Sequence, residues 1–101
     1  MHTKTRLELI IERMALTRAG NILEAAGASG YTVTPAIGGY GGGRRWRRGT
    51  DLSTARDMVV MIAISDSETI DAALTELHRL LENHIGVVNV SDVRVLRPDR
   101  F

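Results

Sequence analysis

An unbroken apolar segment, residues 58–64 (MVVMIAI), is the feature that most constrains how this chain can fold. Side chains of a strand alternate between the two faces of its sheet, so such a run makes both faces apolar. A helix-capping stretch, residues 65–67, follows, and apolar residues then recur at helical spacing across residues 70–81. The sequence therefore predicts a buried strand followed by an amphipathic helix that ends near residue 83.

The rest of the chain repeats this alternation of strand and helix. Periodicity, β propensity and the Gly and Pro stop signals predict strands over residues 5–13, 31–34 and 86–96 and a helix over residues 16–26. The order is therefore β-α-β, loop, β-α-β. We expect an α+β, ferredoxin-like βαββαβ fold with one antiparallel sheet and both helices on one face. Residues 1–101 have room for one domain.

The face of the sheet without helices is expected to be apolar as well, because residues 58–64 place apolar side chains on both sides. Exposure of such a face to water is unfavourable. We therefore expect other copies of the chain to cover it in an obligate oligomer.

The loop between the two halves is rich in glycine and arginine. Residues 38–49 hold six of the ten glycines and four of the 13 Lys and Arg residues, and without those four the chain has 9 basic against 12 acidic residues. Backbone N–H groups and guanidinium groups can converge on a small anion. The sequence predicts a mobile anion-binding loop, and the alternative is a solvated linker.

Several function classes find little support. No stretch is apolar enough to cross a membrane, the N-terminus lacks the features of a secretory signal, and cysteine is absent, so we expect a cytoplasmic protein. The three histidines, His2, His78 and His84, lack the spacing of metal ligands, and no metal site is predicted. No serine has an evident base or nucleophile elbow, so we expect no enzyme activity.

Short motifs in the expected order resemble those of PII signalling proteins. Residues 30–33 (GYTV) and 39–41 (GYG) are similar to the Gly-x-Thr-Val and Gly-Phe-Gly elements of that family, and residues 86–93 (GVVNVSDV) are similar to the strand after its nucleotide-binding turn. The resemblance spans essentially the whole chain. It implies a homotrimer that binds adenine nucleotides between subunits and contacts targets through a flexible T-loop, here residues 38–53.

The resemblance also implies the residues of the nucleotide site. The base of the T-loop and the adenine side of the cleft would be formed by Thr32, Gly39, Tyr40, Gly41 and Ala63. The segment after the second helix would line the cleft with Ile85, Gly86 and Val87, and Arg97 stands near the position of a phosphate-binding arginine.

Two departures from the family pattern favour a particular branch. Gly42 and Gly43 replace the family's arginine and glutamine after Gly-Phe-Gly, and Val87 stands where the family has a phosphate-binding lysine. Both losses argue against sensing of 2-oxoglutarate with MgATP. The chain most resembles the carboxysome-associated PII proteins of inorganic-carbon acquisition, which implies ADP or AMP as nucleotide, a bicarbonate response, and a carboxysome or bicarbonate-transport partner.

The predicted bicarbonate site combines backbone N–H groups of Gly41, Gly42 and Gly43 with a guanidinium group of the loop, from Arg44, Arg45 or Arg47, and the sequence does not decide which arginine faces which anion. A rival hypothesis is a nucleic-acid-binding oligomer, because Trp46 among arginines could stack on a base. We rank it lower, since four arginines make a small footprint. A purely structural oligomer is the third alternative.

Overall fold

The computed structural model describes residues 1–49 and 57–100. Its helices and strands are β1 (His2–Glu12), α1 (Leu16–Ala26), β2 (Thr32–Pro35), β3 (Gly38–Gly41), β4 (Arg44–Arg47), β5 (Met58–Ser65), α2 (Ser67–Leu81) and β6 (Gly86–Val95). Short 3-10 turns follow β1 and β6, at Arg13–Ala15 and Pro98–Arg100.

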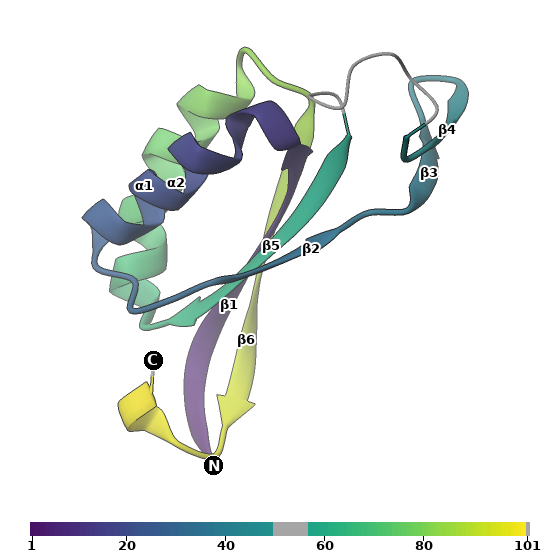
Figure 1. The fold of residues 1–101 in the computed structure, drawn as a ribbon. Helices are drawn as coiled ribbons and strands as arrows, with labels where there is room; N and C mark the ends of the chain where they lie inside the picture. Colours follow the sequence, from purple (N-terminus) through teal and green to yellow (C-terminus); the bar gives the residue numbers. More distant parts are fainter. Residues whose placement is uncertain (50–56, 101) are drawn as a thin grey trace.

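Four strands form one antiparallel sheet in the order β2-β5-β1-β6, and both helices cover one face of it (Figure 1). This arrangement confirms the predicted ferredoxin-like α+β fold. The first strand is longer than predicted and begins at His2, because its N-terminal residues pair with the end of β6, His2 opposite Val95.

The core lies between the sheet and the helices. Alternate residues of the central strands face it in pairs, Leu7 with Ala63 and Leu9 with Met61, and all four are essentially inaccessible. The helices contribute their apolar stripes, whose buried members include Ala19, Leu23, Ile70, Ala73 and Leu77. The helical spacing in the sequence therefore marks the side of each helix that the sheet covers.

The C-terminal end of α1 and the N-terminal end of α2 are capped differently. Gly27 ends α1 with a φ of 101°, a left-handed conformation that glycine adopts without steric cost. Asp66 occupies the N-cap position of α2, as the sequence predicts, but its side chain makes no capping hydrogen bond. The carboxylate instead forms an ion pair of 2.5 Å with Lys4, because β1 runs beside the start of α2.

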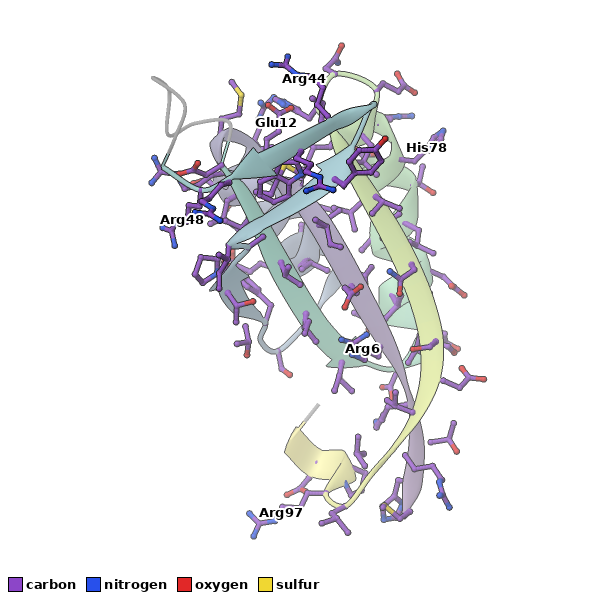
Figure 2. All side chains as sticks on the ribbon, turned by 90° about the vertical axis from the view of Figure 1, so that its right-hand side faces the viewer. Arg6, Glu12, Arg44, Arg48, His78 and Arg97 are labelled. Carbon is purple, nitrogen blue, oxygen red and sulfur yellow. The ribbon has the colours of Figure 1, made fainter. Side chains whose placement is uncertain are left out.

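The opposite face of the sheet carries no helix and is turned toward the viewer in Figure 2. The remaining side chains of β5 lie there, namely Met58, Val60, Ile62 and Ile64, and they are only partly buried in the single subunit. We call this surface the open face. A polar cluster interrupts it, because Glu8 accepts hydrogen bonds from Arg6 and Asn89, each 3.1 Å long.

Candidate functional site

The glycine and arginine loop contains a regular hairpin that the sequence did not predict. Strands β3 and β4 pair with Gly41 opposite Arg44, so the turn has two residues, Gly42 and Gly43. Their φ angles are 58° and 77°, and positive φ at both positions is typical of the tightest hairpin turns. Residues 50–53 of the predicted T-loop lie outside the described residues.

The hairpin projects from the side of the sheet opposite the helices (Figures 1 and 2), and contacts at its base hold it there. The backbone N–H of Arg48 donates to the carbonyl of Ile37 over 2.7 Å. The Asp57 carboxylate accepts a 3.4 Å hydrogen bond from the N–H of Gly49 and lies 3.9 Å from the Arg48 guanidinium. These contacts connect the hairpin to the start of β5.

The hairpin register places the three candidate arginines of the predicted anion site on two faces. Successive strand residues point to opposite faces, and cross-strand partners share a face. Arg44 therefore shares a face with Trp46, whereas Arg45 and Arg47 lie on the other face with Tyr40. The backbone of the hairpin therefore directs Arg45 and Arg47 to one face and Arg44 to the other.

Trp46 lies against Gly39, its cross-strand partner. A Cβ atom on Gly39 would be 2.8 Å from Cζ2 of the indole, which is too close for any other residue without a shift. Trp46 is therefore half-buried although the hairpin around it is exposed. This contact makes the ring less available for stacking on a nucleic-acid base.

The second predicted part of the nucleotide site, residues 85–87, lies at the same end of the sheet as the hairpin (Figure 1). Gly86 is closely packed, because a Cβ there would lie 2.7 Å from both the Ile10 carbonyl oxygen and Cδ2 of Leu81. Its neighbours are open: Ile85 is 72% exposed and Val87 is 54% exposed. The segment therefore presents two apolar side chains to solvent from a tightly packed backbone.

The remaining predicted nucleotide residues are dispersed within one subunit. Thr32 is exposed on the open face, opposite Ile62. The side chain of Ala63 is buried in the core, so only its backbone could face a ligand. Arg97 follows β6 at the far end of the sheet from Arg44 (Figure 2). One subunit does not bring Arg97 together with the hairpin.

Two surface cavities, of about 390 Å³ and 380 Å³, lie elsewhere. The first lies at the start of α2 beside Lys4 and Asp66, and the second lies between α1 and α2 beside Arg18 and His84. Neither is lined by the predicted nucleotide residues. Neither cavity therefore corresponds to the predicted nucleotide site.

Glu12 is the residue near the site that the sequence analysis missed. It lies at the end of β1, is only 8% exposed, and accepts a 2.7 Å hydrogen bond from the N–H of Ile85. The only signal in the sequence is a carboxylate that directly follows the apolar residues 9–11, a pattern that also suits an exposed position. The contact depends on residues 73 positions apart.

Within residues 1–49 and 57–100, no group of three or more His, Asp or Glu side chains is placed to hold a metal ion. No described helix is both long and apolar enough to span a membrane.

The chain belongs to the PII family: the sequence model described as nitrogen regulatory protein P-II matches residues 4–100. Members of this family are regulatory proteins that form homotrimers and bind small-molecule effectors. No curated protein matches the sequence.

Similar solved structures come from PII-like proteins. The structure of CPII from Thiomonas intermedia K12 bound to ADP, AMP and bicarbonate is 28% identical, with a TM-score of 0.88 over 99% of this chain and 94% of that one. CPII bound to ADP, AMP and acetate is 30% identical, with a TM-score of 0.76 over 99% and 95% of the two chains. A PII-like signalling protein of Thermus thermophilus shares the fold at 21% identity, with a TM-score of 0.83 over 98% and 95%.

Proposed function

We propose that this protein is a trimeric, non-enzymatic sensor that binds ADP or AMP between its subunits and responds to bicarbonate. The observation that carries the proposal is its similarity, over nearly its full length, to CPII bound to ADP, AMP and bicarbonate. The two departures support the same ligands, because Gly42, Gly43 and Val87 replace side chains that would serve magnesium and a third phosphate. A bicarbonate sensor of this kind acts in the cytoplasm, in inorganic-carbon metabolism.

The open face supports the trimer. Burial of Val60, Ile62 and Ile64 against two other subunits would remove apolar surface from water, which stabilises association. The trimer also supplies what one subunit lacks at the nucleotide site. Within one subunit Arg97 and the hairpin lie at opposite ends (Figure 2), so we propose that Arg97 joins the hairpin of a neighbouring subunit at the cleft.

The hairpin geometry refines the bicarbonate site. We assign bicarbonate to the face that carries Tyr40, Arg45 and Arg47, because two guanidinium groups and a phenol on one face offer convergent donors. Arg44, on the face of Trp46, is left to contact a partner. The partner is a carboxysome or bicarbonate-transport protein that recognises the hairpin in its ligand-bound form.

Calorimetric titration of ADP, AMP and MgATP, each with and without 2-oxoglutarate, tests this function. We expect ADP or AMP to bind more tightly than MgATP, with no effect of 2-oxoglutarate. Thr32→Val should weaken nucleotide binding, while Thr34→Val, two residues along the same exposed strand, serves as the matched control. Tight MgATP binding that 2-oxoglutarate strengthens would contradict the assignment of ligands.

A further inference from the structure

The backbone of Ile85 is held twice by one residue. Oε1 of Glu12 accepts a 2.7 Å hydrogen bond from the N–H of Ile85, and the N–H of Glu12 donates to the Ile85 carbonyl oxygen over 3.3 Å. The regular pairing of β1 with β6 ends one residue earlier, at Ile11 opposite Gly86. Glu12 thus extends the ladder by one rung, in which its side chain replaces a backbone acceptor.

A second layer of side chains lies beside the Glu12 carboxylate. Nδ1 of His84 lies 3.8 Å from Oε1 of Glu12, and the side chains of His84 and Glu12 are 8% and 10% exposed. On the other side of the ring, Nε2 of His84 lies 2.7 Å from Nη2 of Arg18 on α1. Arginine has no acceptor, so Nε2 accepts this hydrogen bond and the proton of the neutral ring is on Nδ1, facing Glu12.

In this chain of contacts, the N–H groups of Arg18 and His84 therefore each point to the next residue on the way to the Glu12 carboxylate. Arg18 on α1 donates to His84, His84 turns its N–H toward Glu12 on β1, and Glu12 accepts from Ile85. Arg18 is exposed, so this chain connects the outer surface of the helical layer to the segment at the start of β6.

The segment at the start of β6, residues 85–87, exposes its apolar side chains to solvent. Ile85 and Val87 are 72% and 54% exposed, while the intervening Gly86 has no space for a side chain. Exposed side chains supply little packing to fix the position of their own backbone. The Glu12 carboxylate supplies that restraint, and a fixed segment reduces the ordering cost of binding a ligand on it.

We infer that Glu12 is a positioning residue for the nucleotide site, and that it acts by fixing the backbone of Ile85, with His84 and Arg18 orienting its carboxylate. The inference rests on the proposed function, because residues 85–87 are the predicted lining of the nucleotide cleft. The glutamate need not touch the nucleotide. Its role is to keep the backbone of residues 85–87 in the geometry that accepts the nucleotide.

Calorimetric titration of ADP into the full-length protein tests the role of Glu12. Glu12→Ala should weaken ADP binding by about tenfold, because the Ile85 N–H loses its acceptor. Glu12→Gln keeps an oxygen acceptor and should restore binding to within about threefold of wild type. Arg18→Ala, a change at an exposed side chain, should give a smaller loss of about threefold in the same direction. Glu82→Ala, an exposed carboxylate just beyond α2, is the control and should leave affinity unchanged.

The outcomes separate this inference from the proposed function. If wild type binds neither ADP nor AMP, the proposed function fails, and the inference fails with it. If wild type binds and a folded, trimeric Glu12→Ala protein binds equally well, only the role of Glu12 is overturned. Should Glu12→Ala not fold, two other measurements decide. One is the ADP affinity of Arg18→Ala, and the other is ¹⁵N NMR of His84 in wild type, which should show the proton on Nδ1. A proton on Nε2, or unchanged affinity in Arg18→Ala, would overturn the inference.

Discussion

The indole of Trp46 lies so close to Gly39 that a Cβ atom on residue 39 would be 2.8 Å from Cζ2 of the ring. Gly39→Ala should therefore displace the indole toward solvent and shift its emission to longer wavelength. Trp46 is the only tryptophan, so the fluorescence reports on the hairpin alone. Gly41→Ala is the matched control: a Cβ there meets nothing within 4 Å, and its spectrum should equal that of wild type.

Gly20 and Tyr31 give a second prediction, which concerns stability. A Cβ on Gly20 would lie 2.5 Å from the Tyr31 hydroxyl oxygen, so Gly20→Ala requires the tyrosine ring to shift away from residue 20. In a Tyr31→Ala background that obstacle is absent, and the same change should stabilise the helix by about 1 kcal/mol. Urea unfolding of the four proteins measures the coupling. Equal effects of Gly20→Ala in both backgrounds would show that the two residues do not interact.

The pH dependence of stability should include Glu8. Its hydrogen bond from Asn89, followed by that from Arg6, holds the pKa of the Glu8 carboxyl below its ordinary value. A lowered pKa in the folded state means that the contribution to stability is complete at neutral pH and is lost as the pH falls through the ordinary glutamate range and below it. Glu8→Gln should flatten the acid side of the stability profile, measured by urea unfolding at a series of pH values. An unchanged profile would mean that the hydrogen bonds do not persist in solution.

A charged residue on the open face tests whether this face forms the interface of the proposed trimer. Ile62→Glu should separate the proposed trimer into subunits of 11.1 kDa, because the carboxylate would be buried at the interface without a partner. Glu24→Lys, at an exposed position of α1 on the helical side, should keep the mass of wild type. Light scattering gives both masses. A trimeric Ile62→Glu protein would place the interface elsewhere.

The elements whose local signals agree with their tertiary surroundings were predictable from the sequence. The bounds of α1 match the prediction because Gly27 supplies a left-handed C-cap directly after the last residue of the apolar helical pattern. The prediction of β5 also holds, because its apolar run forms a central strand that buries alternate residues in the core. The hairpin was not predicted, because glycine and arginine composition favours a flexible loop, whereas the outcome depends on one two-residue turn at Gly42 and Gly43. The separation of Arg44 from Arg45 follows from that turn.

The candidate site was predicted less completely than the fold, for a physical reason. Gly86 and Ile85 could be chosen from the family resemblance, but the carboxylate that binds Ile85 comes from the end of a strand 73 residues away. No local pattern encodes such a contact. The predicted role of Arg97 at the nucleotide site similarly requires a second subunit, because within one subunit Arg97 lies far from Arg44.

The measurement that tests the central claim most directly is a calorimetric titration of ADP into the wild-type protein with and without bicarbonate at constant pH and ionic strength. The proposed function predicts that ADP binds at one site per subunit and that bicarbonate changes its affinity, with an equal effect of ADP on the affinity for bicarbonate. Arg45→Ala should reduce that coupling more than Arg44→Ala, since the two side chains lie on opposite faces of the hairpin. Absence of ADP and AMP binding, or an ADP affinity that bicarbonate leaves unchanged, would contradict the account.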